Sequence, residues 1–140
     1  DDKAAFIREA YRLLKPGGRL VVADGFVTKP ENNEHQVIRQ WLDGWQVNYL
    51  ETMDEFTAIM KQTGFTTIES RDISKETWRS AKRLYRFYFL ARLYLLWKKI
   101  NFSGPPTELQ RKNIAACKYQ YLGMKKGLWQ YGLITGQKGS

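Results

Sequence analysis

The sequence predicts an α/β fold in which three strands form one sheet and a helical insertion precedes the last strand. An amphipathic helix and an apolar strand follow each other within residues 4–24, AAFIREAYRLLKPGGRLVVAD. Two further strands are expected at residues 65–73 and 128–135, with a stretch of helical periodicity between them. Because the chain has 140 residues, of which 43% are hydrophobic, we expect one domain with its own core.

The expected first helix runs from Ala4 to about Lys15. Its apolar residues recur at the three- and four-residue spacings of one helical face, which predicts that this face packs against a core. These residues are Phe6, Ile7, Ala10, Tyr11, Leu13 and Leu14. Pro16 cannot continue the helix, and the two glycines that follow it let the chain reverse toward the strand.

The expected first strand contains the unbroken apolar run from Leu20 to Ala23 and ends at Asp24. Such a run is typical of a strand that is covered on both faces, as in a parallel sheet. A loop is expected from Gly25 to Asn33. Because ligands of open α/β sheets bind beyond the carboxyl ends of strands, the Asp24 carboxylate is a candidate to accept a hydrogen bond from a substrate. Capping or bracing of the loop is the alternative role.

A family resemblance becomes visible at this joint. The segment DKAAFIREAYRLLKPGGRLVVADGF resembles the passage from the fourth helix to the fifth strand of class I S-adenosylmethionine-dependent methyltransferases of the ubiquinone, sterol and tocopherol type. MKQTGF at residues 60–65 looks like the helix, Gly-Phe and strand that come later in that family, and residues 127–135 resemble its last strand. The resemblance implies the C-terminal half of a Rossmann-like methyltransferase sheet. The glycine-rich cofactor loop of the family does not occur in this sequence.

The resemblance implies that a longer enzyme transfers a methyl group from S-adenosylmethionine to a lipophilic small molecule. The present chain is expected to bind no S-adenosylmethionine and to be inactive alone. Catalytic and cofactor-binding residues are not identified. The candidate substrate-binding residues lie at the end of the first strand, in the segment after it and in the next helix. They are Asp24, Gly25, Phe26, His35, Trp41 and Trp45. His35 is the only histidine and is read either as a surface residue or as a proton-handling group of the acceptor site.

The expected second helix, Gln36 to Leu50, carries apolar residues at positions 38, 41, 42 and 45, two of them tryptophans. Two interpretations stay open. Periodic aromatic residues are most often core residues. In the resembled family, however, this region helps to form a lid over the acceptor.

The next helix begins after Thr52, where Glu55 completes a capping box, and is expected to reach Gln62. A strand with a partly exposed face follows and is expected near an edge of the sheet. Residues 74–127 are then expected to form the helical insertion, as one helix to about Ile100 and a second, capped by Thr107, to about Lys126. The closing strand and a flexible tail, Gly136 to Ser140, complete a division into residues 1–73, 74–127 and 128–140.

The long helix of the insertion combines basic and aromatic residues. Its basic residues Arg79, Lys82, Arg83 and Arg86 line one side, whereas residues 87–97 are apolar or aromatic almost all round. Burial between other elements, contact with a lipophilic substrate or an anionic membrane surface, and binding of nucleic acid are three possible explanations. Nucleic acid is the least favoured partner, because no recognition motif accompanies the charges.

The charge is uneven along the chain. Residues 1–76 carry a net charge of −3, and residues 77–140 carry +12 with Glu108 as their one acidic residue. The alternative to an enzyme is therefore a noncatalytic basic module that binds a membrane surface or nucleic acid.

His35 is the only histidine, so we expect no Ser-His-Asp, Cys-His or multi-histidine metal site within this chain. A single cysteine, Cys117, allows no intrachain disulfide. We expect no metal, and the single cysteine favours a reducing, cytoplasmic setting. Because no apolar run approaches the ~20 residues of a membrane span, the protein is expected to be soluble or peripheral to a membrane. In the resembled fold the first strand would lack its neighbour on one side. That unpaired edge, at Val21 and Val22, predicts a homodimer or a segment-exchanged assembly.

Overall fold

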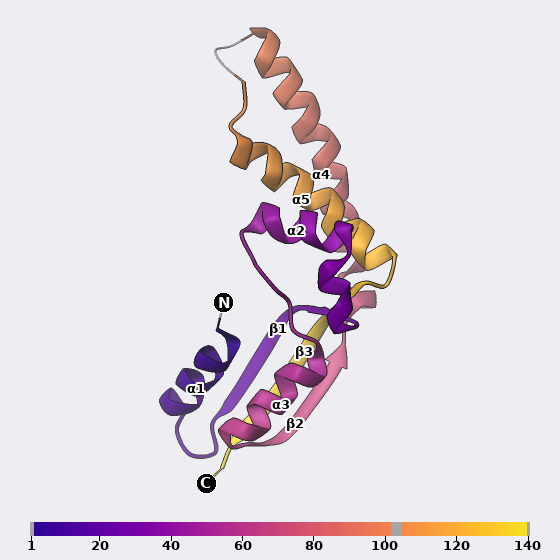
Figure 1. The fold of residues 1–140 in the computed structure, drawn as a ribbon. Coiled ribbons are helices and arrows are strands. Elements are labelled where there is room, and N and C mark those ends of the chain that lie inside the picture. The colour runs from indigo at the N-terminus through magenta and orange to yellow at the C-terminus, as the bar shows by residue number, and fades with distance from the viewer. Residues whose placement is uncertain (1, 102–104, 140) are drawn as a thin grey trace.

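The computed structural model describes residues 2–101 and 105–139. The elements in chain order are α1 (Lys3–Leu13), β1 (Arg19–Val27), the short 3-10 helix η1 (Pro30–Glu34), α2 (Gln36–Trp45), α3 (Met53–Thr63), β2 (Phe65–Asp72), α4 (Ser74–Asn101), α5 (Glu108–Lys125) and β3 (Trp129–Lys138). The strands form one sheet in the order β1-β3-β2. In Figure 1, α1 and α3 lie along this sheet, whereas α4 and α5 extend away from it as an arm.

The structure confirms the α/β class, the three strands and the helical insertion before the last strand. It corrects the expectation of a parallel sheet covered on both faces, since β3 pairs antiparallel with both of its neighbours. Side chains of β1 alternate between the two faces. Leu20 and Val22 pack against the core, but Val21 on the opposite face is 56% exposed. The described residues therefore cover one face of β1 at this point and leave the other open.

A core lies between the sheet and the helices α1 and α3. It contains the buried residues Ile7, Phe26, Phe56, Met60, Phe65 and Ile134. Helix α1 contributes Ile7, with Tyr11 and Leu14 partly buried beside it, as its periodicity predicts. Phe6 and Leu13, which were expected on the same face, are exposed. The buried stripe of α1 is narrower than expected because, within the described residues, the helix contacts α3 and the sheet on one side only.

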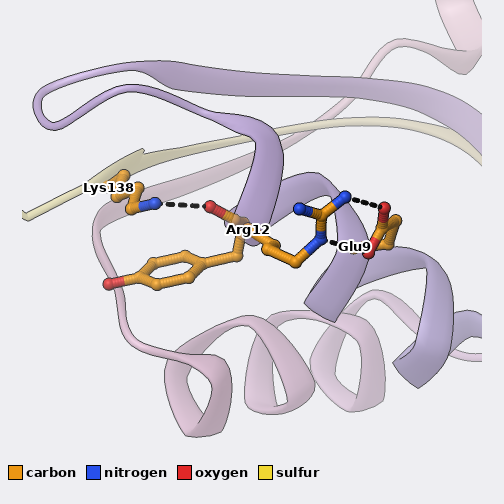
Figure 2. Close-up of polar contacts among 4 residues, drawn as sticks. Glu9, Arg12 and Lys138 are labelled. Carbon is orange, nitrogen blue, oxygen red and sulfur yellow. Dashed lines mark hydrogen bonds and ion pairs between the residues drawn. The ribbon is translucent and has the colours of Figure 1, made fainter.

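Lys138 fastens the end of α1 to the end of β3. Its ammonium donates hydrogen bonds to the main-chain oxygens of Tyr11, at 2.8 Å, and Leu14, at 2.9 Å, as Figure 2 shows for the first of these contacts. Cations at a helix C-terminus are favourable because the last carbonyls there lack partners within the helix. The expected flexible tail is thus wrong for residues 136–138, which belong to β3. On the outer side of α1, Arg12 and Glu9 form an ion pair of 2.7 Å (Figure 2).

Strand β1 is longer than the sequence predicts. Residues Gly25, Phe26 and Val27 were expected in a loop, but they pair with Tyr131, Gln130 and Trp129 of β3. The amide of Val27 also donates a hydrogen bond to the main-chain oxygen of Glu51 at 3.1 Å. These hydrogen bonds pair β1 with β3, a strand far away in sequence. The local pattern of residues around Gly25 therefore does not show that the strand continues.

A second core lies where α2 and α5 meet the end of the sheet. Its buried residues are Val27, Ile38, Trp41, Leu42, Leu50, Ala116, Met124 and Trp129. The two helices approach closely at Gly44, because a Cβ there would stand 2.5 Å from the Cβ of Ala116. Helix α2 was expected to reach Leu50 but ends at Trp45, since Gln46 takes a left-handed conformation with φ of 56°.

The first turns of α4 are tied to the sheet and to α5. The amide of Tyr131 donates to the Ser74 hydroxyl at 2.9 Å, and Tyr121 of α5 stacks on Tyr85 with ring centroids 4.5 Å apart. Further out, the interpretation that residues 87–97 are buried is wrong. Phe87, Phe89, Leu90, Leu93, Tyr94, Leu96 and Trp97 are all more than half exposed. Within the described ranges, no helix has the length and apolar character that a membrane span requires.

Candidate functional site

A cavity of about 270 Å³ opens where β1, α2, α5 and β3 meet. It is lined mainly by aromatic and aliphatic side chains, with one carboxylate and one amide. The lining residues are Asp24, Gly25, Trp41, Leu42, Trp45, Val47, Leu50, Gln120, Trp129 and Tyr131. Apolar walls with a few polar groups are typical of sites for small molecules.

Three aromatic side chains form a continuous wall of this cavity. The ring of Trp41 lies 4.5 Å from that of Trp129 between centroids, tilted by 36°, and Trp129 meets Tyr131 edge-on at 6.3 Å. Gly25 permits this approach, because a Cβ at that position would lie 3.3 Å from Trp41 and 3.4 Å from Trp129. The wall offers ring faces and edges to an apolar ligand.

Gln120 places an unsatisfied amide group at the cavity. Its main-chain oxygen accepts a 2.8 Å hydrogen bond from the indole Nε1 of Trp129. Its side-chain oxygen is buried and has no hydrogen-bond partner among the described residues. Burial of a polar atom without a partner costs about 1–3 kcal/mol, so a turn of the Gln120 side chain toward a ligand that supplies a donor would recover that free energy.

Asp24 is the carboxylate of the cavity. One oxygen accepts a hydrogen bond from the amide of Gly25 at 2.8 Å, and the other pairs with the Lys3 ammonium at 3.2 Å. The sequence predicted Asp24 at the end of the strand. It lies within β1 instead, because β1 continues to Val27. The contact with Lys3 braces α1 against β1, and the Asp24 side chain remains 46% exposed.

Glu51 is a second carboxyl group near Asp24, which the sequence interpretation missed. Burial raises the pKa of Glu51, and the neighbouring charges of Glu55 and Asp24 add to the effect, whereas its backbone hydrogen bond and Lys3 oppose it. The residue lies on the connection between α2 and α3, where no periodic pattern draws attention to it. A carboxyl group with a raised pKa can exchange a proton closer to neutral pH.

The cavity brings together four of the six residues singled out from the sequence, namely Asp24, Gly25, Trp41 and Trp45. Their binding role stays a prediction. Phe26 does not line it; this side chain is 2% exposed and packs on Phe56 in the core beneath α1 and α3. His35 does not line it either. Its Nδ1 accepts a hydrogen bond from the amide of Val37 at 3.1 Å and caps α2.

Gln120, Trp129 and Tyr131 were not singled out, because α5 and β3 reach the cavity through contacts distant in sequence. Among the residues the structure describes, no group of three or more His, Cys, Asp or Glu side chains is placed to hold a metal ion.

No family model matches the sequence. The chain is 33% identical to O-methyltransferase rstn1 of Aspergillus nomiae over 81 residues, which cover 58% of this chain and 36% of the relative. It is 40% identical to the ubiquinone/menaquinone biosynthesis C-methyltransferase UbiE of Pseudoalteromonas translucida over 57 residues, which cover 41% of this chain and 21% of the relative. The chain thus matches roughly a third or less of each curated relative's length.

Solved structures agree over the whole chain. Phosphoethanolamine N-methyltransferase 2 of Haemonchus contortus, in complex with phosphomonomethylethanolamine and S-adenosylhomocysteine, has a TM-score of 0.72 at 17% identity, covering 100% of this chain and 30% of that one. Geranyl diphosphate C-methyltransferase of Streptomyces coelicolor has a TM-score of 0.58 at 19% identity, covering 99% and 43%.

The chain has part of the class I S-adenosylmethionine-dependent methyltransferase fold. The partial coverage fits the C-terminal half that the resemblance implied. Within this methyltransferase fold, the residues that line the aromatic cavity come from β1, from α2 and the connection after it, from α5 and from β3.

Proposed function

We propose that this chain is part of a methyltransferase that acts on a lipophilic small molecule, and that the aromatic cavity holds the methyl acceptor. The observation that carries the proposal is the cavity itself, in which three contacting aromatic rings lie beside the unsatisfied amide of Gln120. Rings of Trp41, Trp129 and Tyr131 would pack against the apolar body of the acceptor, and the amide would fix its orientation.

The relatives support the reaction class and the kind of acceptor. The curated relatives bear the names of methyltransferases, one of them from ubiquinone and menaquinone biosynthesis, and one solved neighbour methylates geranyl diphosphate. Because the chain matches only a fraction of each relative's length, we propose S-adenosylmethionine as the methyl donor and a lipophilic acceptor for a longer protein that contains this chain. Asp24, which lines the cavity, would accept a hydrogen bond from the acceptor.

We propose that the residues present do not by themselves bind S-adenosylmethionine. The Gly17-Gly18 turn precedes β1, and its amides are used internally: Gly17 donates to the main-chain oxygen of Lys138 at 3.0 Å and Gly18 to that of Lys15 at 2.8 Å. They cannot cradle a cofactor while they make these bonds. We therefore expect no saturable heat when the 140-residue chain is titrated with S-adenosylmethionine in a calorimeter. Micromolar affinity would show that another loop of this chain binds the cofactor.

The proposed activity is tested on the product of the complete reading frame. A frame that encodes a strand, a glycine-rich loop and a helix ahead of the present sequence supports an enzyme. That product is incubated with methyl-labelled S-adenosylmethionine and with prenylated or quinone-like acceptors in one arm, and water-soluble amines in the other. Label in the lipophilic acceptor supports the proposal, whereas transfer to the amines alone contradicts it.

A further inference from the structure

The outward side of α4 changes its character along the helix. Exposed cations occupy it near the base of the arm, at Arg79, Lys82, Arg83 and Arg86. The same stripe continues at three- and four-residue steps into exposed apolar residues, Leu90, Leu93, Trp97 and Ile100. The cations therefore lie nearer the sheet, and the apolar residues lie toward the far end of the arm (Figure 1).

A groove of about 330 Å³ lies between α4 and the beginning of α5 in the same region. Three cations, Arg92, Lys99 and Arg111, line it together with apolar side chains that include Leu95 and Ile114. Among the described residues, none of these three cations has a carboxylate partner in an ion pair. A groove with apolar walls and three cations fits an amphiphile with an anionic headgroup.

The two features favour a bilayer over the other partners that a basic surface could bind. Nucleic acid would supply phosphates to the cations but no apolar phase for Leu90, Leu93 and Ile100, of which Ile100 is 82% exposed. A second copy could cover the apolar residues, but residues 77–107 contain no acidic residue, and Glu76 and Glu108 of the arm already pair with Arg71 and Lys112 of the same chain. An anionic bilayer supplies both phosphates and hydrocarbon, and Trp and Tyr are favoured at its interface.

We propose that the arm formed by α4 and α5 docks on an anionic phospholipid surface, with the apolar end of α4 inserted among the acyl chains and the groove cations on lipid phosphates. The attachment is peripheral. Because it rests on the arm and not on the cavity, it is independent of the proposed methyl transfer.

Co-sedimentation with vesicles tests the proposal. The 140-residue chain is mixed with vesicles of phosphatidylcholine alone, or of phosphatidylcholine and phosphatidylserine in equal parts. One variant carries Arg92→Gln, Lys99→Gln and Arg111→Gln. Its matched control carries Lys15→Gln, Lys29→Gln and Lys61→Gln. These three exposed lysines lie outside the arm, and their replacement removes the same total charge. Circular dichroism verifies that each variant is folded.

We expect the chain to bind the phosphatidylserine vesicles at low salt and to bind phosphatidylcholine far more weakly. The groove variant should lose roughly 100-fold in partition constant, because each cation near an anionic surface contributes several-fold. The control triple should retain most of the binding. Failure of the wild-type chain to bind at low salt, or equal losses in both triples, would overturn the proposal.

A single substitution separates insertion from charge attraction. Leu93→Ser and Leu13→Ser remove leucines that are 65% and 67% exposed on two different helices. Leu93→Ser should weaken binding several-fold, and Leu13→Ser should leave it unchanged. Equal effects of the two, or binding to RNA in the absence of vesicle binding, would contradict docking by the arm.

Discussion

The indole Nε1 of Trp129 donates a 2.8 Å hydrogen bond to the main-chain oxygen of Gln120, and this contact joins β3 to α5 at the wall of the aromatic cavity. It places the Gln120 side chain, whose oxygen has no hydrogen-bond partner in the described part of the chain, beside rings that come from β3 and α2. One contact thus contributes both to the stability of the fold and to the shape of the candidate site.

The first prediction concerns this contact. Trp129→Phe removes the buried donor and part of the ring that meets Trp41, so the free energy of unfolding should fall by about 2 kcal/mol. Urea denaturation followed by circular dichroism measures the change. Trp45→Phe is the matched control, since Trp45 is exposed at the cavity, and it should change stability by less than ~0.5 kcal/mol. Equal losses in the two variants would be inconsistent with a stabilising role of the Trp129 contact.

The second prediction tests the approach of α2 to α5. A Cβ at Gly44 would stand 2.6 Å from the main-chain oxygen of Lys112, so Gly44→Ala must push the helices apart and should cost about 2 kcal/mol. Gly139→Ala is the control, because a Cβ there meets nothing within 4 Å. Thermal unfolding compares the two. If Gly44→Ala left the stability unchanged, α2 and α5 would be packed less closely than the structure shows.

The third prediction concerns the pH dependence of stability. Burial raises the pKa of Glu51 in the folded chain above its ordinary value, so the native state binds more protons than the unfolded state between these two values. The free energy of unfolding therefore falls as pH rises through that window. Glu51→Gln should be more stable than wild type at neutral pH, and the gain should disappear in acid below the ordinary pKa of a glutamate. A gain that is constant with pH would exclude this explanation.

The fourth prediction concerns the outer edge of β1. Within the described residues, β1 pairs with β3 on one side and with no strand on the other, and Val21 is exposed there. We propose that this edge pairs with a second copy in the isolated chain, because an unpaired strand with apolar side chains templates association. Val21→Lys should shift the mass measured by light scattering from dimer to monomer, whereas Ser70→Lys at the opposite edge should not. A wild-type chain that stays monomeric at high concentration would refute the dimer.

Local signals in the sequence predicted local structure well. Thr52 and Glu55 form the expected capping box, and Thr107 caps α5 through the amide of Gln110. Proline and glycine at residues 16–18 end α1 and lead into β1 as expected. These features depend on residues within one turn of each other, so their spacing is visible in the sequence.

Contacts between distant segments account for what the sequence did not show. The antiparallel ladder with β3 extends β1 through Phe26, and that side chain packs on Phe56 in the core instead of lining the cavity. Gln120 belongs to the site because α5 packs on α2, which no spacing along α5 reveals. The apolar residues of the arm gave no indication of their exposure, because burial depends on which other elements lie nearby.

The most direct test of the central claim is the Michaelis constant for the acceptor in the enzyme encoded by the complete reading frame. Gln120→Leu removes the unsatisfied amide, and Trp45→Ala removes an exposed ring at the cavity. If the cavity holds the acceptor, each variant should raise KM for a lipophilic acceptor by roughly 5-fold and leave KM for S-adenosylmethionine unchanged, since a lost ring contact or hydrogen bond costs about 1 kcal/mol. Phe6→Ala on α1, an aromatic residue of similar exposure, should change neither constant. An unchanged acceptor KM in both cavity variants would contradict the assignment.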